Sequence, residues 1–443
     1  MKRLLEKSLL EWKNKKDRMP LLLDGARQVG KSYLIEYLFG NKHFKRVIKL
    51  DFLQEPGLAH IFSDSKNPET IIAGIQLEFA IDIDPENDLI FLDEIGECQS
   101  AVDSLKFFQE QRPELYICAS GSNIGLLNRF PVGKVEEYRL YPLTFEEFVI
   151  AAGNEQQTKM YQASQRNELL HGKLWSLLLD YYFVGGMPKA VQTWFEGDRS
   201  KLNALVASVR TVHSNLISGY IRDFGKYGRY PSEAIQTQAV FENIPKQLMK
   251  NMNGSVKRYQ FSHVIPRKKG YQELRSPIDF LLKTRLASQN FVIEGKPQST
   301  LFVQAKESRF KLFFFDLGLL HCMANMSYKE IVQQNFAYKG YVAENFVQNE
   351  AIALGHSCTY SWHSGRQAEL EFLFKNDKGE VIPIEVKSGT SIKAKSMGLY
   401  IKNYSPVEAY KLTGKIGGFR DSVLKTFPLY YAHQCIRRLL NTE

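Results

Sequence analysis

Residues 25–32 read Gly25-Ala26-Arg27-Gln28-Val29-Gly30-Lys31-Ser32, and they set the architecture of the first third of this 443-residue chain. An apolar run, residues 21–23, precedes them, and residues 33–38 carry a helical pattern. A strand, a Gly-x-x-x-x-Gly-Lys-Ser loop and a helix in this order form a phosphate-binding loop. The glycines let backbone N–H groups turn towards phosphate oxygens, and the helix start adds partial positive charge.

The chemistry of this loop predicts a magnesium–triphosphate ligand. We expect Lys31 to bridge the outer phosphates and the hydroxyl of Ser32 to ligate Mg²⁺. The residues expected to line the nucleotide phosphates are Gly25, Ala26, Arg27, Gln28, Val29, Gly30, Lys31, Ser32 and Tyr33.

Three further apolar runs, residues 46–52, 89–92 and 115–119, predict strands, and helical segments lie between them. Such alternation indicates an α/β domain with a parallel sheet covered by helices on both faces. Ligands of these sheets bind at the carboxyl ends of the strands. The phosphate loop, Asp93-Glu94 and residues 120–123 all follow strand ends.

Their positions assign roles to the polar residues. Asp93 is expected to hold Mg²⁺ through water, and Glu94 to polarise the attacking water, so Lys31, Asp93 and Glu94 form the predicted catalytic set. Ser122 is a candidate for contact with the terminal phosphate. Ser120 and Asn123 remain alternatives for that contact, as does a simple turn.

These motifs and the segment Tyr138-Arg139-Leu140-Tyr141-Pro142-Leu143-Thr144-Phe145-Glu146-Glu147-Phe148 resemble AAA-type ATPases that carry a C-terminal domain of unknown function, the DUF4143 family. The resemblance extends through most of the chain. It implies a nucleotide-binding AAA domain with ATP and Mg²⁺ as cofactors. Many AAA proteins form rings, so a homo-oligomer is compatible with it, and Arg129 and Arg139 are alternatives for an arginine finger.

Changes in composition divide the chain into four expected domains. They are a P-loop AAA-type ATPase domain (1–150), a helical lid (151–235), a winged-helix-like basic domain (236–330) and a nuclease-like domain (331–443). Helices followed by a hairpin, with positive charge between them, favour the winged helix and contact with DNA or another nucleic acid. Its basic residues are Lys246, Lys250, Lys257, Arg258, Arg267, Lys268, Lys269 and Arg275.

The C-terminal domain contains a second group of candidate functional residues. Glu385 and Lys387 lie two apart on a predicted strand and so share a face, Glu371 is expected on the neighbouring strand, and a helix presents Glu344. The pattern resembles the PD-(D/E)xK nuclease superfamily and implies a restriction-endonuclease-like α/β fold. Glu371 replaces the usual aspartate, which favours a domain that binds without cleaving.

Bulk properties leave several functions open. The net charge of +10 permits contact with a polyanion, and five scattered cysteines suit a reducing cytoplasm. No apolar run is long enough to span a membrane. We expect an ATP-hydrolysing protein whose nucleotide state controls engagement of nucleic acid. The alternatives are an ATP-regulated, metal-dependent nuclease and a nucleotide-bound scaffold that does not hydrolyse ATP.

Overall fold

The structure is a computed structural model that describes residues 1–127, 129–227, 231–250, 255–333, 340–365, 368–387, 395–419 and 423–440. The chain divides into two compact units. Unit 1 comprises Met1–Tyr141 together with Lys283–Arg285, and unit 2 comprises Pro142–Leu282 and Leu286–Glu443.

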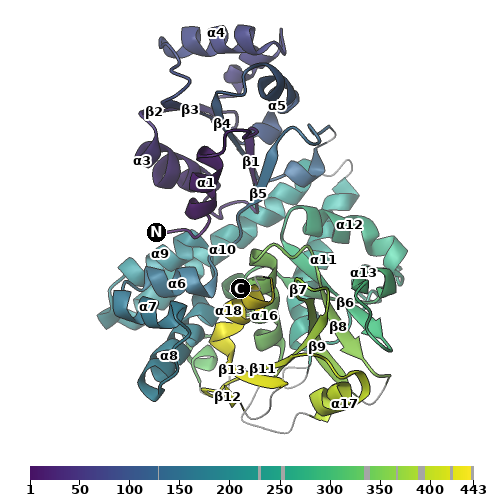
Figure 1. Ribbon diagram of the computed structural model, residues 1–443. Helices are drawn as coiled ribbons and strands as arrows, with labels where there is room; N and C mark the ends of the chain where they lie inside the picture. Colours follow the sequence, from purple (N-terminus) through teal and green to yellow (C-terminus); the bar gives the residue numbers. More distant parts are fainter. Residues whose placement is uncertain are drawn as a thin grey trace. The chain divides into compact units, whose positions relative to one another are not determined.

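Unit 1 is built on a five-stranded sheet with the order β2-β3-β4-β1-β5, in which all neighbouring strands are parallel (Figure 1). The strands are β1 (Leu21–Asp24), β2 (Arg46–Asp51), β3 (Asp88–Asp93), β4 (Tyr116–Gly121) and β5 (Glu136–Arg139). The predicted parallel α/β core is therefore confirmed. Because the strands are parallel, their carboxyl ends lie along one edge of the sheet.

Helices cover both faces of this sheet. They are α1 (Glu6–Lys13), α2 (Lys31–Tyr33) with its π-helical continuation Leu34–Gly40, α3 (Asn41–His43), α4 (Pro68–Phe79) and α5 (Gln99–Gln111). Ile90 and Leu92 of β3 pack with α4 and α5 in one buried cluster. On the opposite face Trp12 of α1 meets Phe39 and Tyr116 edge to face. β3 is buried along its whole length, as expected for a strand that helices cover on both faces.

Unit 2 begins with a helical region. Its helices are α6 (Phe145–Ala151), α7 (Glu155–Gln162), α8 (Glu168–Val184), α9 (Pro188–Glu196), α10 (Leu202–Tyr227), α11 (Pro231–Met249), α14 (Leu317–Met323) and α15 (Tyr328–Ile331). Gly185 and Gly186 form a tight turn between α8 and α9. A Cβ at Gly186 would lie 2.3 Å from the backbone oxygen of Leu143, so no larger residue fits there.

An eight-stranded mixed sheet forms the rest of unit 2, with the order β12-β13-β11-β10-β9-β8-β6-β7. The strands are β6 (Ala287–Glu294), β7 (Phe310–Phe314), β8 (Thr359–His363), β9 (Glu369–Lys375), β10 (Val381–Val386), β11 (Ala409–Thr413), β12 (Gly418–Phe419) and β13 (Leu424–Pro428). The accompanying helices are α12 (Tyr271–Lys283), α13 (Leu301–Gln304), α16 (Gly340–Ala353), α17 (Lys395–Tyr404) and α18 (Ala432–Leu440). α16 packs on β6, β7 and β10, whereas α17 packs on β9.

Two expectations differ from the structure. The hairpin expected for a winged helix exists as β6 and β7, but β6 also pairs in parallel with β8. The predicted boundary at residue 330 therefore falls inside one sheet. The second difference concerns residues 276–288, whose pattern predicts a helix: α12 ends at Lys283, because Ala287 already pairs with Phe314. The apolar residues around position 287 fit the period of a helix as well as that of a strand, and only strand pairing distinguishes the two structures.

Candidate functional site

The phosphate loop of unit 1 connects β1 to α2 with an unusual backbone. Gly30 has φ +93° and Gln28 has φ +66°, both in the left-handed region. A Cβ at Gly25 would lie 2.2 Å from the carbonyl oxygen of Leu140. The glycines at both ends of the motif are therefore required, one by its φ angle and the other by close backbone approach.

Lys31 is the buried cation of this loop. Its Nζ donates to the carbonyl oxygens of Gly25 at 3.0 Å and Ala26 at 3.1 Å, and burial lowers the pKa of its ammonium group. Arg3 also supports the loop, because it donates to the carbonyl oxygen of Val29 at 2.8 Å. The sequence analysis missed Arg3, which lies 26 residues from its partner and belongs to no motif.

Asp93 accepts hydrogen bonds from two other residues that the sequence places at the site. Its Oδ1 accepts hydrogen bonds from Ser32 Oγ at 3.0 Å and Ser120 Oγ at 2.5 Å, so three segments distant in sequence converge at the ends of β1, β3 and β4. A carboxylate and a hydroxyl are the hard oxygen donors that Mg²⁺ prefers. The residues present at this position therefore fit the ion that the sequence predicts.

Lys49 on β2 is a second functional residue that the sequence analysis missed. Its Nζ lies 3.0 Å from Asp93 Oδ2 and 3.4 Å from carboxylate oxygens of both Glu36 and Asp51. Burial alone would lower the pKa of Lys49, but the hydrogen bond and charge of Asp93 outweigh it and raise the pKa. The lysine therefore stays charged and balances three carboxylates. Only the register of β2 against β3 reveals this, since it aligns Asp51 with Asp93.

Glu94 and Ser122 form the neighbouring contact. Glu94 has φ +48°, and Ser122 Oγ donates to Glu94 Oε2 at 3.2 Å. Among the three sensor alternatives, Ser122 thus touches the predicted water-activating carboxylate and Ser120 touches Asp93. Arg129, one of the two alternatives for an arginine finger, forms an ion pair with Asp103 at 3.3 Å.

The remaining predicted residues of the loop differ in exposure. Ala26 and Val29 are buried, Arg27 is half-buried and Gln28 is exposed. Tyr33 is exposed and stacks on Tyr37, with ring centroids 5.4 Å apart.

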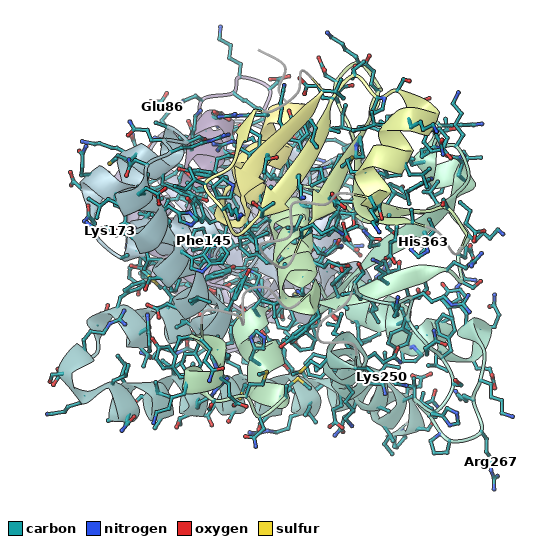
Figure 2. The ribbon with its side chains drawn as sticks, turned by 90° about the horizontal axis from the view of Figure 1, so that it is seen from below. Glu86, Phe145, Lys173, Lys250, Arg267 and His363 are labelled. Atoms are coloured by element: carbon teal, nitrogen blue, oxygen red, sulfur yellow. The ribbon has the colours of Figure 1, made fainter. Side chains whose placement is uncertain are left out.

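In unit 2 the basic residues of the segment 246–275 are almost all exposed. Lys250 and Arg267, labelled in Figure 2, are both exposed, and Arg267 extends away from the ribbon. Lys268 is half-buried, because its Nζ donates to Gln236 at 2.7 Å. The exposed members are Lys246, Lys250, Lys257, Arg258, Arg267, Lys269 and Arg275. They are thus available to a polyanion.

The predicted nuclease-like carboxylates Glu344, Glu371 and Glu385 lie with Glu369 in a group that we call the carboxylate cluster (Glu344, Glu369, Glu371 and Glu385). Lys387 Nζ lies 3.1 Å from Glu385 Oε1 and 3.9 Å from Glu371 Oε1. Glu371 also accepts from the backbone N–H of Val386 at 2.9 Å. Within the described ranges, neither oxygen of Glu385 accepts a hydrogen bond.

Two residues that the sequence analysis missed complete the cluster. Lys311 on β7 is fully buried, and its Nζ lies 3.0 Å from Glu344 Oε2 and 2.6 Å from Glu369 Oε1. Glu369 begins β9, and His363 (Figure 2), at the end of β8, lies 3.2 Å from it. Lys311 lies 33 residues from Glu344 in the sequence, so no local pattern links the two.

The pKa values in the cluster follow from burial and from these cations. Burial raises the pKa of Glu344 to about 8 and also raises that of Glu371. Burial acts in the same direction on Glu369, but Lys311 and His363 outweigh it and lower the pKa to about 2. Glu369 therefore carries the negative charge that Lys311 balances.

These residues do not fit a metal ion in the observed arrangement. An ammonium group already lies against two carboxylates of the cluster. Across the part of the chain that the structure describes, no three His, Cys, Asp or Glu side chains are grouped as metal ligands. The metal-dependent nuclease site implied by the resemblance therefore has no set of metal ligands among the described residues.

Comparison with protein families gives three matches along the chain. Residues 17–149 match the model of an AAA domain, residues 176–330 a domain of unknown function (DUF8612), and residues 339–417 a domain of unknown function (DUF4143). The AAA and DUF4143 domains expected from the sequence are thus confirmed. No family match supports a nuclease or a winged helix. The chain has no match among curated proteins.

Two solved structures match the chain at low similarity. One is the Aeropyrum pernix ORC1 protein in complex with DNA, with 13% identity, a TM-score of 0.31 and coverage of 72% of this chain and 90% of that chain. The other is Drosophila ORC bound to DNA, with 12% identity, a TM-score of 0.26 and coverage of 72% and 84%.

None of the described helices combines the length and the apolar character needed to cross a bilayer.

Proposed function

We propose that unit 1 binds ATP with Mg²⁺ and hydrolyses it. The observation that carries this proposal is the meeting of Ser32 and Asp93, 3.0 Å apart, beside a phosphate loop within an AAA domain. Phosphoryl transfer depends mainly on positioning and on charge neutralisation, so a lysine, a metal site and one placed carboxylate are sufficient.

Each residue has a distinct task in this proposal. The backbone of the loop and the ammonium of Lys31 bind the phosphates. On binding them, Lys31 gives up its hydrogen bonds to the carbonyl oxygens of Gly25 and Ala26. Ser32 and Asp93 hold Mg²⁺, which when bound neutralises charge on the phosphates. Glu94 orients the attacking water and takes up its proton, and Ser122 fixes the carboxylate of Glu94.

The test separates binding from turnover. Lys31→Ala removes charge-assisted hydrogen bonds worth about 3 kcal/mol, so ATP affinity measured by calorimetry should fall ~100-fold. Lys7→Ala is the matched control, because Lys7 is exposed and forms a solvent-exposed ion pair with Glu11. Glu94→Gln should keep ATP affinity and lose at least ~100-fold in phosphate release. Equal turnover in Glu94→Gln would remove Glu94 from its proposed role.

We further propose that the nucleotide state controls how unit 2 engages nucleic acid through its exposed basic residues. Lys257 and Arg258 are adjacent and exposed, and neither forms an ion pair within the described residues. Replacing both by alanine should reduce the salt slope of DNA or RNA binding by about 2, since each phosphate contact contributes about 1. Lys402→Ala on α17 serves as the control, because Lys402 is also exposed but lies outside the basic segment.

Phosphate release also distinguishes hydrolysis from the alternative of a nucleotide-bound scaffold. A wild-type chain that binds Mg·ATP yet releases no phosphate, with or without nucleic acid, would favour the scaffold. The same assay tests the proposed coupling between nucleotide state and nucleic-acid binding. If the two are coupled, the rate of phosphate release changes when nucleic acid is added.

A further inference from the structure

Lys311 is buried where a lysine is costly. It lies in the middle of the apolar strand β7 (Phe310–Phe314), fully removed from solvent. A lone buried ammonium group is unstable, so its presence requires compensating carboxylates. Glu344 on α16 and Glu369 on β9 provide them at 3.0 and 2.6 Å. The lysine thus joins a helix and two strands of unit 2.

Both oxygens of Glu344 and both oxygens of Glu371 have partners. The backbone N–H of Val256 donates to Glu344 Oε1 at 2.8 Å, and Ser255 Oγ donates to Glu371 Oε1 at 3.1 Å. Both donors come from the segment that precedes α12. A divalent ion needs several free carboxylate or carbonyl oxygens at one point. At Glu344 and Glu371 ammonium, hydroxyl and amide groups already use them, whereas Glu385 faces only the ammonium of Lys387 among the described residues.

We propose that the ammonium of Lys311 is the resident cation of the carboxylate cluster, and that it occupies the place in which a divalent metal ion would otherwise bind. The cluster is then a metal-independent latch that fastens Ser255 and Val256 to the sheet. Among the described residues, the cluster then holds no metal ion with which unit 2 could cleave a polyanion that it binds. This inference does not depend on ATP binding by unit 1.

Removing the ammonium of Lys311 should allow a divalent metal ion to bind in the carboxylate cluster. Lys311→Ala deletes the cation and leaves space beside Glu344, Glu369 and Glu371, and the buried charge of Glu369 then needs a counter-ion. Lys311→Met is the matched control, because it removes the charge but fills the same volume. We expect Lys311→Ala to gain one Mn²⁺ site and Lys311→Met to gain none.

The measurement is Mn²⁺ binding by electron paramagnetic resonance on the full chain without nucleotide. Lys311→Ala should bind one more Mn²⁺ than wild type, with an affinity at least ~100-fold above any binding by the wild-type cluster. Mn²⁺ should also raise its thermal midpoint by about 3 °C or more. A folded Lys311→Ala chain that takes up no additional Mn²⁺ at ~1 mM overturns the proposal.

A second arm uses only conservative changes and does not require Lys311→Ala to fold. Glu371→Gln keeps the size of the side chain and an acceptor for Val386. In the wild-type background this change should leave the number of bound Mn²⁺ ions unchanged, because the cluster holds none. Loss of a Mn²⁺ ion in Glu371→Gln shows that the wild-type cluster is a metal site and refutes the inference.

Discussion

Replacing Lys49 by methionine tests the electrostatics of the nucleotide site directly. Methionine keeps most of the length of the side chain but removes the ammonium that lies 3.0 Å from Asp93 and 3.4 Å from Glu36 and Asp51. A hydrogen bond to a charged group contributes about 1.5–3 kcal/mol. The side chain of Lys49 is 29% exposed, which places the loss near the middle of that range, at about 2 kcal/mol.

For a unit of this size the loss corresponds to a fall of about 6 °C in the thermal midpoint of the nucleotide-free chain. Saturating Mg·ATP should reduce this deficit, because Mg²⁺ then neutralises part of the charge on Asp93. Calorimetry with and without Mg·ATP measures both quantities. The control is Lys42→Met, which breaks a half-exposed pair with Glu6 worth no more than about 1 kcal/mol. An unchanged midpoint, or a deficit that Mg·ATP does not alter, would refute the reasoning.

Three further predictions follow from single contacts. Gly25→Ala places a Cβ 2.2 Å from the Leu140 oxygen and should destabilise unit 1 by about 2–3 kcal/mol in denaturant titrations, whereas Gly57→Ala, with open space around it, should be nearly neutral. Arg3→Ala loosens the loop at Val29 and should weaken ATP binding ~10-fold in calorimetry; unchanged affinity would exclude a bracing role. Burial raises the pKa of Asp316 to about 6, so the folded chain retains a proton there that the unfolded chain loses near pH 4. Stability from this group therefore falls as the pH rises from about 4 to 6, and wild type should lose about 3 kcal/mol relative to Asp316→Asn over that window; parallel pH curves would contradict it.

The sequence predicted unit 1 well because its signals are local. Strand, loop and helix are adjacent around Lys31, and Asp93 directly follows its strand. Parallel pairing then brings these ends to one edge, as expected for any sheet of this kind. The different contacts of Ser120 and Ser122 needed the structure: Ser120 lies in β4 and donates to Asp93, whereas Ser122 follows β4 and donates to Glu94.

Unit 2 was harder to predict because its sheet is assembled from distant segments. β6 and β7 carry the pattern of a simple hairpin, yet β6 pairs with β8, about 70 residues later. Nothing in residues 236–330 indicates that pairing. Loop lengths and apolar periodicity describe each segment by itself, whereas sheet order depends on which segments meet in space.

The amino-acid sequence alone predicted the phosphate loop with Lys31, the parallel core and the E-x-K element with Lys387, because neighbouring residues along the chain carry those signals. Only the tertiary structure identified Lys49, Lys311 and Glu369. Lys49 and Lys311 belong to no motif, and each acquires its role from carboxylates contributed by other elements. Charge compensation acts over a few ångströms in space, and the chain reaches such distances only after folding.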